Sequence, residues 1–377
     1  MEGQTDKKIN YFVEMNSKGA DPTVWQKLKR NKGAFIGLIV IGLSILTALF
    51  GYWLAPDSSP YANRMILEIG GRSPGFAAQF LMLPAVEKND PASMLEKTIS
   101  GSIDQWTYLP ISSFEKKKDS IIVQQFVDDD TSVRAAFPLS IWEESGSNQV
   151  DPVTNKRFFL GTDKYGRDIL SRLIIGVRVS LGVGLITVLI SLSIGVLLGA
   201  IAGYYRGRID QIITWFINVI WSIPTLLLVF AFTLLLGKGF WQVFVAIGLT
   251  MWVNIARIVR GQLLKEREME YVEAARALGY SNNRILFRHI LPNIMGPVWV
   301  VAASNFASAI VIEAGLSFLG IGVQPPQPSW GLMIKENFNF IITHNPMLAL
   351  APGFAIMILV LAFNLVGNGL RDALAVK

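Results

Sequence analysis

The chain has 377 residues, of which 51% are hydrophobic and only 16% are charged, and its formal net charge is +6. Its mean hydropathy of +0.42 is high for a soluble globular protein, so the composition favours a membrane protein. The chain has no cysteine and two histidines, which excludes disulfides and leaves few ligands for a cysteine or multi-histidine metal site.

The positive charge is not gathered in one long patch. Basic residues stand in short groups beside apolar runs, an arrangement that is typical of membrane topology and not of nucleic-acid binding. We therefore expect no nucleic-acid partner.

The N-terminal segment, residues 1–32, is polar and ends in the basic group Lys27, Lys29, Arg30 and Lys32. The uncharged run 33–55 follows, and it is long enough to cross a bilayer, which takes about 20 residues. The positive-inside rule then predicts a cytoplasmic tail at 1–32 and a retained first transmembrane helix at 33–55.

Residues 56–160 differ from the rest, being polar and mixed in charge, with turn formers and strand-like pieces such as 120–123. We expect an extracytoplasmic insertion of roughly 100 residues, which can bury a modest core. The charge runs 116–118 and 128–130 are interpreted as solvated surface.

A short glycine-containing segment stands just before the second apolar run. Its residues of interest are Gly161, Thr162, Asp163, Gly166, Arg167 and Asp168. Taken alone, they are ordinary turn and helix-cap residues.

Further apolar runs predict five more transmembrane helices, at 179–203, 212–236, 240–259, 297–321 and 347–370. In the first of these, Gly195, Gly199 and Gly203 recur every fourth residue, which predicts a helix face that another helix approaches closely. Pro224 lies within the run 212–236 and predicts a kink there.

The charged segment from Lys265 to Pro297 lies between two of these runs and cannot cross a bilayer. Its pattern predicts a helix at 266–278, a break at Gly279, and a second short helix from an N-cap at Ser281 to Ile290. The small pair Ala274 and Ala275 suggests a shallow docking surface for another protein. The alternative is a solvated amphipathic linker.

Glu273-Ala274-Ala275, Gly279 and the sequence HILP at 289–292 resemble the EAA loop of ABC importer permeases, the segment by which such permeases engage their ATPases. The sequence LGTDKYGRDILSRLIIGVRVSLGVG, which starts at Leu160, is similar to the opening of the core domain in C-type dipeptide, oligopeptide and nickel permeases. The likeness covers residues 25–55 and 158–374, and it departs from the family at His289 and Asn368.

The resemblance implies an all-α polytopic fold of the ABC type I importer permease, with six transmembrane helices and both termini in the cytoplasm. It implies a core at 161–377 and a cytoplasmic coupling loop at 265–292. The residues expected to couple to the ATPases are Glu273, Ala274, Ala275, Gly279 and Pro292.

The resemblance also implies partners in a bacterial inner membrane: a second homologous permease, two cytoplasmic ATPases that carry ATP and Mg, and an extracytoplasmic substrate-binding protein. The chain itself is expected to be non-catalytic and to bind no cofactor, and it has no GxxxxGK[ST] motif. Peptides or related small solutes are the implied cargo, moved by alternating access.

Glu313 and Asn305, in the run 297–321, are the candidates for the translocation path. A carboxylate at membrane depth is costly and often functional, although a structural hydrogen bond is the competing interpretation. Two other classes stay open: a gradient-driven secondary transporter that uses Glu313, and a membrane-anchored protein whose exported insertion carries the function.

Overall fold

A computed structural model describes residues 23–85, 93–144, 151–237, 239–343 and 345–374. The predicted tail is therefore described only from residue 23, and 1–22 lie outside the described residues. Within them, five helices are long and apolar enough to cross a membrane, and a bent pair would make six. The five are α3 (Lys32–Leu54), α6 (Ile169–Tyr205), α9 (Phe240–Glu266), α12 (Leu291–Phe318, continuous with the turns from Asn282) and α15 (Met347–Leu374).

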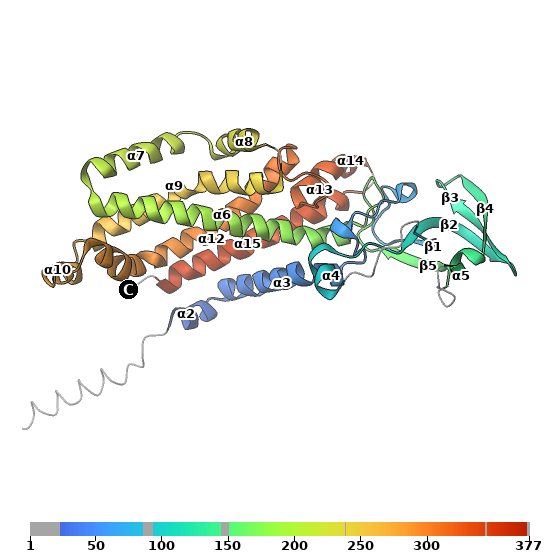
Figure 1. The fold of residues 1–377 in the computed structure, drawn as a ribbon, viewed down its shortest axis with the longest axis horizontal. Helices are drawn as coiled ribbons and strands as arrows, with labels where there is room; N and C mark the ends of the chain where they lie inside the picture. The colour runs from blue at the N-terminus through green and yellow to red at the C-terminus, as the bar shows by residue number, and fades with distance from the viewer. Residues whose placement is uncertain (1–22, 86–92, 145–150, 238, 344, 375–377) are drawn as a thin grey trace, which may run out of the picture.

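The long helices run side by side, and α6 and α9 form the central pair (Figure 1). The glycine stripe of α6 faces α9, as predicted. A Cβ at Gly195 would lie 2.7 Å from the carbonyl oxygen of Trp252, and one at Gly199 would lie 2.5 Å from that of Ala256. The two backbones can approach this closely only because the stripe has no side chains.

The prediction of one kinked helix at 212–236 is wrong in detail, because the chain forms two helices in its place. They are α7 (Gly207–Trp221) and α8 (Thr225–Leu236), bent by 93° at the break between them. Pro224 stands at the N-cap of α8, where it cannot donate a backbone hydrogen bond to extend α7.

The prediction of an all-α protein is also wrong, because the segment between α3 and α6 contains a five-stranded antiparallel sheet. Its strand order is β4-β3-β2-β1-β5. The strands are β1 (Phe76–Pro84), β2 (Trp106–Lys116), β3 (Ser120–Phe126), β4 (Ser132–Pro138) and β5 (Val153–Phe158), and the pairing is fixed by registers such as Leu81 with Leu109. The short helices of this segment are η1 (Pro60–Ala62), η2 (Leu67–Ile69), α4 (Met94–Ser100) and α5 (Ser140–Glu144).

The sheet buries side chains on both faces. One face forms a cluster with Leu81, Ile121 and Trp142, and the indole of Trp142 donates a 2.7 Å hydrogen bond to the carbonyl oxygen of Met82. The other face packs Phe80 and Phe158 onto the loops that lead to the membrane helices. The segment thus has the core that its length allows.

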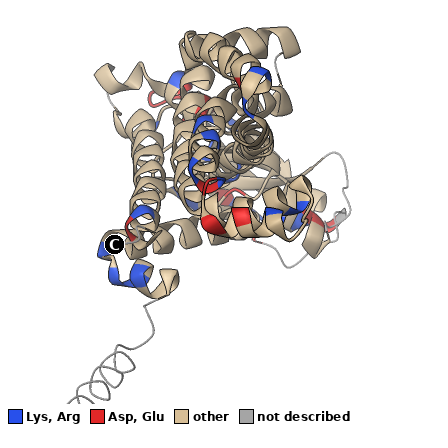
Figure 2. Cartoon of the chain, turned by 90° about the vertical axis from the view of Figure 1, so that its left-hand side faces the viewer, with Lys and Arg blue, Asp and Glu red and all other residues tan. Residues whose placement is uncertain are grey.

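The two ends of the molecule differ in kind. Helix α2 (Val24–Arg30), helix α10 (Glu270–Ala277) and the end of α15 lie at one end, and the sheet lies at the other (Figure 1). Seen from the first end, basic and acidic residues are visible on the elements that face the viewer (Figure 2). Short helices α11 (Asn282–Arg284), η3 (Ile285–Ile290), α13 (Trp330–Asn337) and α14 (Phe340–Thr343) complete the described chain.

Candidate functional site

The charged segment 265–292 forms a compact cap at the end of the bundle that lies away from the sheet. Helix α9 runs to Glu266, and α10 starts at Glu270 after a short bend, so the first predicted helix is shorter than expected. The break at Gly279 is confirmed: its φ is +77°, and the amides of Gly279 and Tyr280 donate to the carbonyls of Arg276 and Ala275. This is the Schellman pattern of a glycine-ended helix.

The second predicted helix does not stop at Ile290. The chain passes from α11 through one π-helical turn, η3, directly into α12. Pro292 is exposed in the first turn of α12, where its missing N–H would have no partner in a regular helix. The cap is therefore continuous with α12, without an intervening loop.

The cap has an inner and an outer face. Val272 and Ala275 are buried against residues of α9 and α12 such as Val259 and Ile294. Glu273 and Ala274 are exposed, as is Gly279. The pair of alanines is thus divided: Ala275 fixes the cap to the bundle, and Ala274 lies on the outer surface.

Polar contacts tie the cap to the corner between α6 and α7. The hydroxyl of Tyr204 donates to Oδ1 of Asn282 at 2.8 Å, and Arg206 forms a 2.5 Å ion pair with Glu268. Arg206 holds the pKa of the Glu268 carboxyl below its ordinary value. Arg267 donates to the carbonyl oxygen of Tyr204.

The outer side of the cap also exposes large apolar side chains, with Leu278 71% and Phe287 57% exposed.

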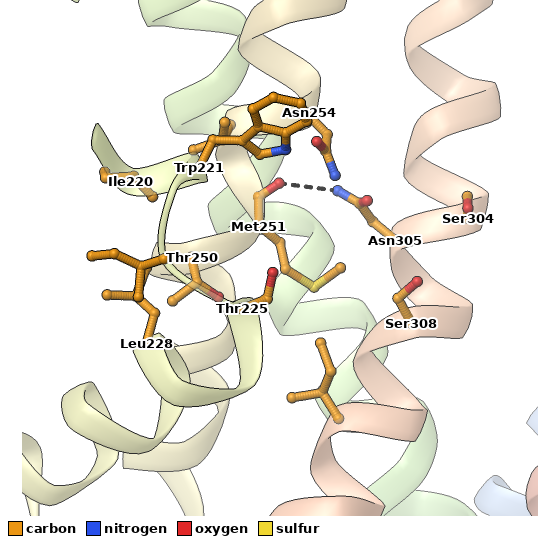
Figure 3. Close-up of a pocket in the computed structure, with 13 residues that line it drawn as sticks. Ile220, Trp221, Thr225, Leu228, Thr250, Met251, Asn254, Ser304, Asn305 and Ser308 are labelled. Carbon is orange, nitrogen blue, oxygen red and sulfur yellow. Dashed lines mark hydrogen bonds between the residues drawn. The ribbon is translucent and has the colours of Figure 1, made fainter. Parts of the chain in front are cut away.

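A second feature is a pocket of about 260 Å³ at the break between α7 and α8, lined on its other sides by α9 and α12 (Figure 3). Its polar lining comprises Thr225, Thr250, Asn254, Ser304, Asn305 and Ser308. Asn305 is 4% exposed, and its Nδ2 donates to the carbonyl oxygen of Met251 at 3.3 Å. Asn305 was predicted from the sequence, whereas Asn254 and Ser308 were missed. The sequence pattern that could have identified these two residues is the presence of amide and hydroxyl side chains within apolar helices.

Glu313, the other candidate for the path, does not line this cavity. It is 1% exposed, and its Oε1 accepts a 2.6 Å hydrogen bond from the hydroxyl of Ser317. The same hydroxyl accepts from the backbone amide of Val323 at 3.0 Å, which fixes the turn after α12. The geometry favours a structural hydrogen-bond role near the end of the helix.

The segment before α6 is a tight buried turn. Gly161 and Gly166 have φ values of +79° and +73°, and a Cβ at Gly166 would lie 1.7 Å from the carbonyl oxygen of Ile66. Thr162 accepts from the amide of Arg72 at 3.0 Å. The turn therefore joins the loops that follow α3 to the start of α6.

Buried charges hold this turn. Arg167 pairs through Nε with Asp163 at 2.6 Å and through Nη2 with Glu336 of α13 at 2.7 Å. Arg172 is also buried, with its guanidinium 3.6 Å from Glu336. Sequence reasoning missed Arg172 and Glu336, although an arginine inside an apolar run is a signal for a buried partner.

Asp168 is the N-cap of α6. Its Oδ2 accepts from the amide of Ser171 at 2.8 Å, and Ser171 Oγ in turn accepts from the amide of Asp57. Burial raises the pKa of the Asp168 carboxyl above its ordinary value. Together the six residues of the turn act as a structural joint between the outer segment and the bundle.

Comparison with known proteins gives two family matches. Residues 195–377 match the binding-protein-dependent transport system inner membrane component, and residues 23–67 match the N-terminal transmembrane domain of oligopeptide transport permease C. A dipeptide transport system permease of Alkalihalophilus pseudofirmus is 41% identical over 62% of this chain and 77% of the relative. The chain belongs to this family of importer permeases.

Other relatives of the permease include an oligopeptide transport permease of Bacillus subtilis, 40% identical over 60% of this chain and 74% of the relative. A dipeptide permease of Lactococcus lactis is 28% identical over 96% of both chains. Among solved structures, an inward-facing methionine ABC transporter is similar to the chain with a TM-score of 0.46 and 21% identity, over 55% of this chain and 98% of that one.

The family sets what the chain is: a mostly helical, multi-pass membrane protein and a non-catalytic permease subunit of an ABC importer. Permeases of this family work with ATPases and a substrate-binding protein. The expectation of a permease subunit is thereby confirmed, and the gradient-driven alternative is displaced.

Proposed function

We propose that the chain forms one half of the translocation path of a bacterial inner-membrane importer for peptides or related small solutes. A second, homologous permease would supply the other half. The relatives' names support this cargo, since they include dipeptide, oligopeptide and glutathione permeases.

The observation that carries the proposal is the polar cavity at the α7–α8 break. It presents amide and hydroxyl groups, with Asn254 and Asn305 on two different helices. Such groups both donate and accept hydrogen bonds, as peptide groups do, and they impose no fixed charge on the cargo. A path for varied peptides needs this neutrality.

In the proposed topology, both termini and the cap at 265–292 face the cytoplasm, and the sheet faces the outside. The basic group at 27–32 supports this orientation, and α2 lies at the same end as α10. The outer face of the cap, with Glu273, Ala274 and Gly279, would contact the ATPases, which bind the ATP and Mg.

Coupling then follows from the connections of the cap. Closure of the ATPases would move α10, and the direct passage through η3 would carry that movement into α12, on which Asn305 stands. The cavity lies between α9 and α12, the two helices that flank the cap. Alternating access requires such an element with different contacts in two states.

The test is Asn305→Leu, which keeps the branching at Cγ and removes both hydrogen-bonding groups. We expect peptide uptake to fall about tenfold, equivalent to about 1.4 kcal/mol, with the subunit still assembled in the membrane. The matched control is Val311→Leu, on the exposed side of the same helix. Native uptake by Asn305→Leu would contradict a path through this cavity.

A further inference from the structure

We propose that α4 is an interfacial helix whose apolar face enters the bilayer leaflet on the side of the sheet. It would fix the sheet unit, residues 76–158, against the membrane surface. This inference concerns the position of the unit in the membrane and does not depend on the cargo.

The apolar face of α4 consists of large hydrophobic side chains that are strongly exposed. Met94 is 79% exposed, Leu95 77% and Ile99 70%. Leu95 and Ile99 are one helical turn apart, so they lie on the same face. Ile103, just beyond the helix, is 60% exposed and extends the group. A soluble surface rarely leaves such a group uncovered.

The position of α4 indicates what covers this face. It lies beside the end of α3 that is nearer the sheet (Figure 1). The indole of Trp53 donates a 3.1 Å hydrogen bond to Thr98 Oγ1, and the ammonium of Lys97 lies 4.3 Å from the centre of the Trp53 ring. Tryptophan and lysine together are typical of the membrane–water interface.

The exposed face of α4 also continues a surface that lipid covers. Helix α3 spans the membrane with Leu46, Leu49 and Leu54 more than half exposed. Because α4 is in contact with the end of this helix, its apolar side chains extend the same lipid-facing surface. Lipid is thus the occupant that the structure favours over a protein partner.

Arg178 of α6 fixes α4 in this position. Its guanidinium donates to two carbonyl oxygens of α3, Ala48 at 2.6 Å and Leu49 at 3.1 Å. It also donates to two of α4, Thr98 at 2.6 Å and Ile99 at 2.8 Å. Thr98 and Ile99 stand in the last turn of α4, where carbonyls lack intrahelical partners, and Ala48 and Leu49 directly precede the non-helical Phe50 of α3. This joint holds α4 at a set depth relative to α3.

The natural absence of cysteine makes the test direct. The full chain carries one cysteine at a time, in the variants Leu95→Cys and Ile99→Cys, with Glu96→Cys as the control at an exposed polar position of the same helix. Leu46→Cys on α3 is the reference for lipid exposure. Each variant is spin-labelled and reconstituted in phospholipid vesicles, and collision with oxygen is compared with collision with a water-soluble nickel chelate.

We expect the labels at 95 and 99 to resemble the label at 46, with oxygen favoured severalfold over the chelate relative to the label at 96. Equal access of the chelate to 95, 96 and 99 would overturn the proposal, because α4 would then lie in water. Protection of 95 and 99 from both reagents would also overturn it, because a protein and not lipid would cover the face.

Discussion

Gly166 shows how one residue joins the outer segment to the membrane bundle. Its backbone is left-handed, and a Cβ would lie 1.7 Å from the carbonyl oxygen of Ile66. We expect Gly166→Ala to lower the free energy of unfolding by about 3 kcal/mol, since conformational strain and a backbone clash add. Gly207→Ala is the control, because Gly207 has a φ of +59° with nothing within 4 Å of its Cβ position, and it should cost about 1 kcal/mol. Equal thermal midpoints of the two variants in detergent would contradict the clash.

Lys156 of β5 gives a pH-dependent prediction. Burial, with the nearby Arg64, lowers the pKa of its ammonium to about 8. An unfolded lysine titrates near pH ~10.4, so between these values the unfolded chain holds more protons than the folded chain. Stability from this group therefore rises as pH increases from 8 to 10. The thermal midpoint of the native chain should rise relative to that of Lys156→Met over this pH range. A difference between the two midpoints that stays constant or shrinks would contradict the prediction.

At the scale of single residues, the sequence identified most of the residues of these sites but few of the contacts that they make. The turn from Gly161 to Asp168 was singled out, and its glycines and helix cap have the predicted local roles. The ion pair of Arg167 with Glu336 joins residues 169 positions apart, and no local pattern indicates such a partner. Asn305 was likewise named without the cavity around it, because that cavity depends on how four helices, α7, α8, α9 and α12, meet.

The cap at 265–292 depends on one backbone conformation. Gly279 has φ +77°, and nothing lies within 4 Å of its Cβ position. The backbone conformation, and not a lack of space, therefore limits which residues position 279 tolerates. We expect Gly279→Asn to keep most of the uptake, because asparagine adopts left-handed backbone at low cost. Gly279→Val should reduce uptake severalfold while ATP hydrolysis continues, because a β-branched residue disfavours that conformation. Equal uptake by both variants would show that the left-handed cap is not needed for coupling.

Among the elements, those set by local chemistry were the most predictable. The glycine break of the cap and the glycine stripe of α6 both follow from the absence of a side chain. The sheet was not predicted beyond the strand-like piece at 120–123, and the pairing of β1 with β5 joins distant segments, as with Phe76 and Phe158. Pro224 predicted a kink, but the 93° turn also needs the non-helical residues that precede it.

For the whole molecule, the sheet unit should be removable if the joint with α6 is spared. Phe76 and Phe158 are directly paired, so a short glycine linker can replace residues 77–157. This deletion keeps Asn63 and Arg72, which contact the turn before α6. We expect the shortened chain to insert in the membrane and to associate with its ATPases.

The matched control is a deletion of residues 60–155, which removes Asn63 and Arg72 as well. It should fail to accumulate, because Arg167 and Thr162 lose partners on a buried turn. If both deletions accumulate equally, the joint is not the element that stabilises the start of α6.

The most direct test of a permease that is driven by ATPases through residues 265–292 is co-purification with tagged ATPase subunits of the same importer. The native chain would be compared with Glu273→Ala and Ala274→Trp, both on the exposed face of α10. The control is Lys118→Ala, in the turn between β2 and β3, strands that lie at the opposite end of the molecule. The account predicts that the native chain and Lys118→Ala retain the ATPases, whereas Ala274→Trp loses most of them and Glu273→Ala loses part. Full retention by both α10 variants, with correct membrane insertion, would contradict the assignment of this face as the coupling surface.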